Sequence, residues 1–235
     1  NNALTNDTTG NQNVAVGGNS LDANTTANNN TAVGYNSLSA TTTGSSNTAI
    51  GSAAAGNNTT GAANTALGYG ALNVNTTGGS NIAIGAGALD AHTTAINNAA
   101  IGTNCLTFNT TGANNVAIGL EALEKNSTAS NNVAVGLQAL EENTTGSDNV
   151  AVGTRALDAL GTGNYNVAVG YECLTDQSGA TSYNVAVGYQ AGQNVTTSDS
   201  HVLIGYAAGA TLTTGAHNVA IGRNAMLYAT TAHSS

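Results

Sequence analysis

Apolar and polar residues alternate along the chain in a 17-residue pattern, Asn-x-Ala-Val-Gly-x-x-Ala-Leu-x-x-Asn-Thr-Thr-Gly-x-x. Repeat positions are numbered from the leading Asn, which is position 1. Every step is 17 residues except the one from Asn166 to Asn184, which is 18. A short fixed period is typical of solenoids, in which each copy buries its apolar residues against the next. The 13 copies begin at residues 13, 30, 47, 64, 81, 98, 115, 132, 149, 166, 184, 201 and 218.

The first half of each copy predicts short strands. In Asn13-Val14-Ala15-Val16 the side chains at positions 2 and 4 point to one side and Ala15 to the other, as in a strand. The Ala-Leu pair at positions 8 and 9 predicts a second strand, after a bend at Gly17 where a positive φ favours glycine. The Asn-Thr-Thr-Gly segment predicts the return turn, and stacked Asn residues predict hydrogen-bonded ladders. The fold class is therefore an all-β, parallel β-solenoid (β-roll) of about 13 rungs, roughly 60 Å long at the usual strand spacing.

Position 3 is alanine in twelve of the thirteen copies, and Leu203 is the exception. A column held to one small apolar residue indicates a close approach by something flat. That neighbour could be another layer of the same coil or the matching column of a second chain. We predict the second arrangement, a homotrimer in which chains meet at these residues. The predicted interface consists of Ala15, Ala32, Ala49, Ala66, Ala83, Ala100, Ala117, Ala134, Ala151, Ala168, Ala186 and Ala220.

Composition narrows the possible partners. Only 6% of the residues are charged, the net charge is −9, and the three cations are Lys125, Arg155 and Arg223. A nucleic-acid surface needs clustered basic residues, which this chain does not supply. No apolar run approaches the ~18 residues of a membrane span, so membrane insertion is not expected. We treat residues 1–235 as a single repeat domain, and the lack of atypical end repeats predicts that it is excised from a longer fibre.

Reactive side chains form no catalytic pattern, so we expect no enzyme activity, cofactor or metal. The histidines His92, His201, His217 and His233 occupy four different repeat positions and are expected to be solvated or turn-capping.

Glu124, Glu141 and Asp158 share one column, which we interpret as a solvated acidic patch rather than a hard-metal site. Arg155 is expected to face Glu172 one rung away. Cys105 and Cys173 lie four rungs apart, too far for a disulfide, and are expected to be small buried residues.

Two other columns suggest alternative binding roles. Aromatic residues just after the glycine could stack on sugars, although partial burial with a wet hydroxyl is the simpler interpretation. These residues are Tyr35, Tyr69, Tyr171, Tyr189 and Tyr206. Threonine pairs form a ladder that could order water in an ice-binding solenoid, although only one residue of each pair would be displayed. The pairs are Thr25-Thr26, Thr59-Thr60, Thr76-Thr77, Thr93-Thr94, Thr110-Thr111 and Thr144-Thr145.

The Asn-x-Ala-Val/Ile-Gly units, with glycines such as Gly17, Gly34 and Gly51, resemble the head repeats of trimeric autotransporter adhesins (YadA-like heads). Units with the added Ala-Leu-x-x-Asn-Thr-Thr-Gly are still more similar to repeats of phage tail-fibre proteins. The adhesin resemblance implies a trimer of parallel β-rolls, and the phage resemblance implies a virion fibre that carries a receptor-binding tip. We therefore expect the shaft of a phage tail fibre or bacterial surface filament. It would be extracellular or on the virion surface, with a host-surface glycan or protein as receptor.

Overall fold

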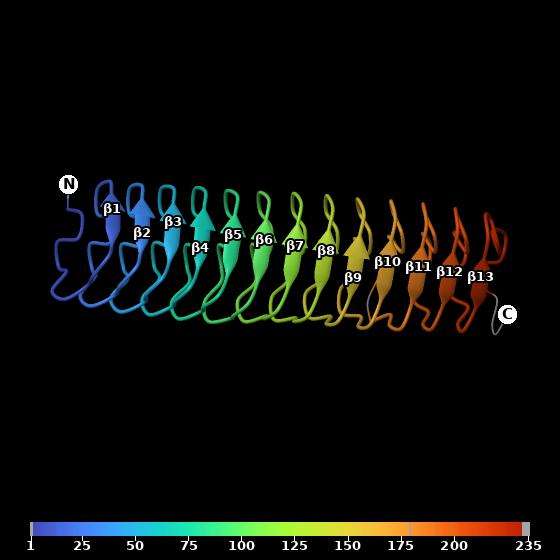
Figure 1. The fold of residues 1–235 in the computed structure, drawn as a ribbon. Helices are drawn as coiled ribbons and strands as arrows, with labels where there is room; N and C mark the ends of the chain where they lie inside the picture. The colour runs from blue at the N-terminus through green and yellow to red at the C-terminus, as the bar shows by residue number, and fades with distance from the viewer. Residues whose placement is uncertain (1, 179, 232–235) are drawn as a thin grey trace. The chain divides into compact units, whose positions relative to one another are not determined.

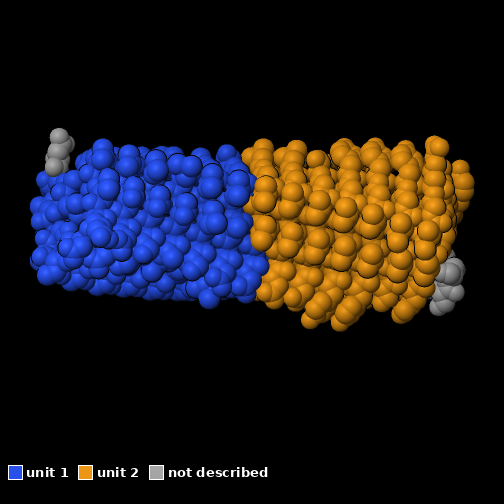
Figure 2. Space-filling view, viewed as in Figure 1, with its two compact units in different colours: residues 1–115 blue, residues 116–235 orange. Residues whose placement is uncertain are grey.

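The computed structural model describes residues 2–178 and 180–231. These residues contain thirteen three-residue strands and no helix, which confirms the all-β prediction. They form two compact units, residues 1–115 and residues 116–235 (Figure 2). Unit 1 contains β1 (Val14–Val16), β2 (Thr31–Val33), β3 (Thr48–Ile50), β4 (Thr65–Leu67), β5 (Ile82–Ile84) and β6 (Ala99–Ile101). Unit 2 contains β7 (Val116–Ile118), β8 (Val133–Val135), β9 (Val150–Val152), β10 (Val167–Val169), β11 (Val185–Val187), β12 (Val202–Ile204) and β13 (Val219–Ile221).

Within each unit the strands follow one another in chain order and are parallel, one strand per coil (Figure 1). Pairing is in register, so that equal repeat positions lie side by side, for example Ala32 beside Ala49. The 18-residue step does not disturb this register, since Val167 still pairs with Val185. Each unit is therefore a parallel β-solenoid of 17-residue coils, as the period predicts.

A glycine ends each strand at repeat position 5. Gly51 has a φ of 138°, a conformation that is open to glycine and strained for other residues. A Cβ on Gly51 would lie 2.4 Å from the carbonyl oxygen of Gly68 in the next coil. The glycine is thus required both for the bend and for the close stacking of coils, and the bend predicted at this position is confirmed.

The second strand predicted at the Ala-Leu pair is wrong. The described residues of that segment form turns, because positions 7 and 9 adopt left-handed backbone angles in coil after coil. Leu72 has a φ of 55° and Leu123 a φ of 52°, values that are uncommon for residues with a side chain. Two left-handed residues with one residue between them curl the chain, so the leucine side chain is turned into the coil instead of lying on a flat strand.

The interior of each coil combines small apolar residues, leucines and asparagines. Ala134, Ala139 and Leu140, at positions 3, 8 and 9, are fully buried. The predicted Asn ladder is confirmed at position 1. The amide N–H of Asn47 donates to Oδ1 of Asn30 at 2.9 Å, and Nδ2 of Asn47 donates to the carbonyl oxygen of Gly61 at 2.9 Å. Each such Asn therefore links two coils and also ties its own strand to the return segment, which satisfies buried polar groups that would otherwise be costly.

Unit 2 contains a compensated change of this core. Position 9, usually leucine, is Gly192 and Gly209 in two consecutive coils, and position 3 of the second of these coils is Leu203 instead of alanine. A Cβ on Gly192 or Gly209 would lie 2.8 Å from a terminal carbon of Leu203. The side chain of Leu203 thus lies beside both glycines, and at Gly192 it is joined by Leu174 and Val195.

Candidate functional site

The predicted interface at position 3 needs correction, because its alanines lie inside the coil. Ala32, Ala49, Ala83, Ala100, Ala117, Ala134, Ala151, Ala168 and Ala186 are fully buried in a single chain, Ala66 and Ala220 are nearly so, and Ala15 is partly exposed. The narrow space between the strand and the Ala-Leu segment admits only a small side chain. Of the two arrangements that the sequence left open, the structure has the intra-chain one. The eleven buried alanines therefore offer no surface to a second chain.

Because position 3 faces the inside of the coil, the residues at positions 2 and 4 lie on the outside. Their side chains form what we call the outer strand face, and many of them are aliphatic and more than a third exposed. No residue of this face in any of the thirteen strands is charged. Exposed aliphatic side chains in a continuous column mark a surface suited to association. The more exposed members are Val14, Val16, Ile50, Leu67, Ile82, Ile101, Ile118, Val187, Ile204, Val219 and Ile221.

The tyrosine column does not offer free ring faces where it is continuous. In unit 2, Tyr171, Tyr189 and Tyr206 stack on one another with ring centroids 5.2 Å apart. The guanidinium of Arg223 lies over the ring of Tyr206, 5.5 Å from its centroid. In unit 1, Tyr35 and Tyr69 are exposed and two coils apart. Sugar stacking needs an open ring face, so the continuous column is better suited to stiffening the coils than to binding a glycan.

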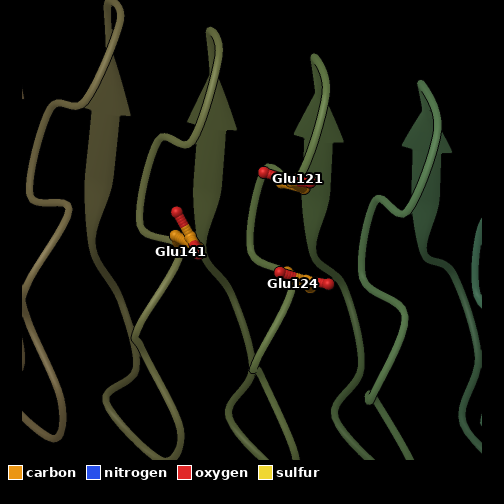
Figure 3. Close-up of side chains that lie close together, drawn as sticks. All are labelled: Glu121, Glu124 and Glu141. Atoms are coloured by element: carbon orange, nitrogen blue, oxygen red, sulfur yellow. The ribbon is translucent and has the colours of Figure 1, made fainter.

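Two members of the predicted acidic column, Glu124 and Glu141, lie close to Glu121 in unit 2, whereas the third member, Asp158, accepts a hydrogen bond from Arg155. Carboxylate oxygens of Glu121, Glu124 and Glu141 lie within 4.8 Å of one another (Figure 3). Partial burial raises the pKa of Glu124, with a contribution from Glu121, and partial burial also raises that of Glu141, with a contribution from Asp158. Glu124 and Glu141 therefore take up a proton more readily than a fully solvated glutamate.

Two basic side chains offset negative charge in this region, and one amide donates a hydrogen bond to a carboxylate. Arg155 Nε donates to Asp158 Oδ2 at 2.9 Å, and Arg155 Nη1 lies 3.7 Å from Glu172 Oε1, which confirms the expected pairing with Glu172. Lys125 pairs with Glu142, and Gln138 Nε2 donates to Glu121 Oε2 at 3.1 Å. The arrangement is a solvated patch with local neutralisation, and we assign it no ion.

All four histidines were expected to be solvated or turn-capping, and for two of them burial excludes the solvated alternative. His92 and His201 are fully buried and replace asparagine in the ladders at positions 12 and 1. His92 Nε2 lies 2.9 Å from the carbonyl oxygen of Ala95. Because that carbonyl can only accept, Nε2 carries the proton. His217 is exposed as expected, and His233 lies outside the described residues.

The second ring nitrogen of each buried histidine faces a donor. His92 Nδ1 lies 3.3 Å from Nδ2 of Asn109, and His201 Nδ1 accepts from the backbone N–H of Asn218 at 3.3 Å. His201 Nε2 lies 2.9 Å from Ser198 Oγ. Burial lowers the pKa of both imidazoles, and for His201 the nearby His217 lowers it further. Both rings are therefore held neutral.

The cysteines are buried in the column that is usually alanine, as predicted, and neither forms a disulfide. Burial raises the pKa of the Cys173 thiol to about 12. Its Sγ donates to the carbonyl oxygen of Ala186 at 3.3 Å. A thiol of this kind is not a nucleophile at neutral pH.

The threonine pairs divide into an internal and a displayed member. At position 13 the hydroxyl of Thr59 donates to the carbonyl oxygen of Thr76 at 2.8 Å, and Thr76 donates in the same way to Thr93 at 3.0 Å. At position 14 the residues are exposed, and no side-chain hydrogen bond is found for Thr60 or Thr77. The threonine at position 14 is therefore the exposed member of each pair, whereas the one at position 13 is half-buried, and at Thr59 and Thr76 its hydroxyl is bonded to the next coil.

The described residues form no pocket that could enclose a small ligand. None of them belongs to a helix long and apolar enough to cross a membrane. The candidate functional parts of the molecule are therefore its repeated outer faces. Comparison with protein-family models, curated proteins and solved structures gave no match to this chain.

Proposed function

We propose that this chain is a structural segment of an extracellular fibre, the shaft of a phage tail fibre or bacterial surface filament. The observation that carries this proposal is the uncharged outer strand face, which repeats in every coil. A role without catalysis agrees with a repeat whose polar side chains are used mainly to join one coil to the next.

The outer strand face is suited to a second copy of the same chain. Its residues recur with each coil, so parallel copies can match coil by coil and form the same contact many times. The face is free of charge in a chain of net charge −9, so association there avoids direct repulsion between carboxylates. We propose three chains around one axis, which is the state that the resemblance to adhesin heads implies.

The test is to place charge on this face and measure the mass of the assembly. Val150 and Val167 are neighbours on β9 and β10, and their side chains are partly exposed. We expect wild type to sediment as a trimer and the Val150→Lys/Val167→Lys variant as a monomer, because lysines at the centre of an interface would be desolvated without partners.

A matched control uses Thr145→Lys with Thr162→Lys, which adds the same charge at exposed positions of adjacent coils. It should keep the trimeric mass. A monomeric wild type, or a Val150→Lys/Val167→Lys variant that keeps its mass, would overturn the assignment of this face. A dimeric wild type would overturn the three-chain arrangement.

A further inference from the structure

We propose that the return segment of unit 1 presents a flat threonine surface that binds the face of an ice crystal. This role is separate from fibre formation and uses different residues. The surface, here called the threonine face, consists of the exposed residues at position 14 and of their neighbours at position 16, of which some, such as Ala62 and Ile96, are exposed and the others in unit 1 are half-buried. Its threonines in unit 1 are Thr9, Thr26, Thr43, Thr60, Thr77, Thr94 and Thr111.

The first step of the argument is that the fold does not use these hydroxyls. Thr59 at position 13 donates its hydroxyl to the next coil, which explains a threonine at that position. Thr60 beside it contributes its backbone N–H, 3.1 Å from the carbonyl oxygen of Thr76, which any residue except proline could supply. Yet position 14 is threonine in every coil except the tenth, where the extra residue lies.

Another exposed position shows that the repeat tolerates variation at its surface. Position 17 is exposed in the first five coils, where it is Asn29, Ser46, Ala63, Ser80 and Asn97. Copying of one ancestral unit would keep all positions equally similar. The constancy of position 14 therefore indicates a requirement imposed from outside the chain.

The second step is that the face is held rigidly in register. Position 15 is buried between the two outward positions, as at Gly61 between Thr60 and Ala62, both of which are exposed. Position 17 is also bonded from coil to coil, since the N–H of Ala63 donates to Ser45 and that of Ser80 to Ala62, both at 3.0 Å. Position 14 side chains thus recur at the strand repeat of about 4.8 Å.

The third step is the chemistry of the surface. In unit 1 no residue at positions 13 to 17 is charged, although a typical soluble domain has ~25% charged residues. Position 16 is small or polar in most coils, as at Ser45, Ala62 and Gly79. A charged side chain would organise water around itself, whereas methyl and hydroxyl groups at a regular spacing can hold water in an ice-like arrangement.

The absence of a pocket in the described residues agrees with a ligand that is itself flat and periodic. Each threonine contributes little, so binding depends on many contacts made at once along the column. Interrupting the column should therefore weaken binding to ice by far more than the loss of one contact would.

The experiment measures the fraction of labelled full-length protein that enters a slowly growing ice hemisphere. We expect wild type to be taken up, and the Thr60→Tyr/Thr77→Tyr variant to be excluded several-fold more strongly, because two bulky rings would hold the surface away from the ice. The matched control is Asn57→Tyr with Val74→Tyr, at exposed positions of the same two coils. It should be taken up like wild type.

Circular dichroism of each variant establishes that the coils remain folded. Exclusion of wild type from ice, or equal uptake of the Thr60→Tyr/Thr77→Tyr variant, would overturn the proposal. The Val150→Lys/Val167→Lys variant tests independence, since uptake that persists in the monomer separates this role from the proposed fibre. Binding of wild type to an insoluble polysaccharide but not to ice would also overturn the assignment.

Discussion

Units 1 and 2 share one coil geometry but differ in the number of charged residues that they carry and in the first residue of their strands. Unit 1 has three charged residues, Asp7, Asp22 and Asp90, whereas unit 2 has nine acids and all three basic residues. At the first residue of the strands, unit 1 has threonine in β2, β3 and β4, whereas unit 2 has valine in all seven strands. The difference shows that the buried Ala, Leu, Asn and Gly columns suffice to specify the coil. The outward positions are therefore free to be selected for other purposes.

The largest effect is expected from the glycines that both units share. In Gly51→Ala of unit 1 and Gly153→Ala of unit 2 the new Cβ would lie 2.4 Å and 2.3 Å from a backbone oxygen of the next coil. We expect each change to lower the free energy of unfolding by roughly 4 kcal/mol, from backbone strain and overpacking together. Urea denaturation measures the loss.

Gly70→Ala is the control, because no atom lies within 4 Å of its added Cβ, and its φ of 63° is one that other residues adopt at the same repeat position. It should lower the free energy of unfolding by well under half as much as Gly51→Ala does. A large loss in one unit and a small loss in the other would show that the two units do not depend on the same bend.

The next effect tests the altered core of unit 2. Leu203→Ala should lower the free energy of unfolding by about 3 kcal/mol, because it leaves a cavity beside Gly192 and Gly209. Gly209→Leu alone should also destabilise, since its side chain would meet Leu203. The double variant restores the arrangement of unit 1 and should recover much of the loss. If the double variant loses as much free energy of unfolding as the two single variants together, Leu203 does not compensate for the missing leucine at position 9.

Acid sensitivity should separate the units by their buried histidines. His92 in unit 1 and His201 in unit 2 have lowered pKa values when folded, so the unfolded chain binds protons more readily. Stability is therefore complete above about pH 6.5 and falls as the pH drops below it, by at most ~1.4 kcal/mol per unit of pKa difference. His217 and Asp199 near His201 modify its titration in opposite directions.

Hydrogen exchange resolves this effect unit by unit. His92→Asn should protect unit 1 at pH 5, and His201→Asn should protect unit 2, because asparagine is the usual ladder residue and does not titrate. Equal acid sensitivity with and without these changes would mean that other groups control it.

The smallest effect concerns the outer strand face of unit 1. Thr48→Val with Thr65→Val would give β3 and β4 the surface of unit 2, and we expect slightly tighter self-association, by up to ~1 kcal/mol per site. Sedimentation equilibrium over a range of concentrations measures it. Serine at the same two sites is the control, and weaker association of the valine variant would argue against this face as the contact.

The sequence predicted the period, the strand, the glycine bend and the Asn ladder, because each depends on spacing and residue type. It did not predict which side of the strand faces inward. Alternation separates Ala15 from Val14 and Val16, but it does not say whether the alanine column meets another layer of the same coil or a second chain. Left-handed leucines such as Leu72 leave no signal in residue type, so the second strand was predicted where the chain turns.

The buried histidines could have been identified from the repeat itself. His201 occupies the column that is asparagine in all other copies, and His92 the column that is asparagine in most of unit 1. A single substitution in a ladder column inherits the burial of that column. In a repeat protein of this kind, the other residues at the same repeat position therefore predict the burial of a side chain better than its neighbours in the sequence do.

Because the coils stack in register, the length of each unit can change only in steps of one coil. Removing or adding 17 residues changes a unit by one complete coil and leaves every bend, ladder and core contact with an equivalent partner. A change of one residue can be absorbed only in a turn, as in the coil that begins at Asn166, where the strands keep their register. The length of each unit therefore changes only in whole coils, and recombination between copies can add or remove a coil while every contact keeps an equivalent partner.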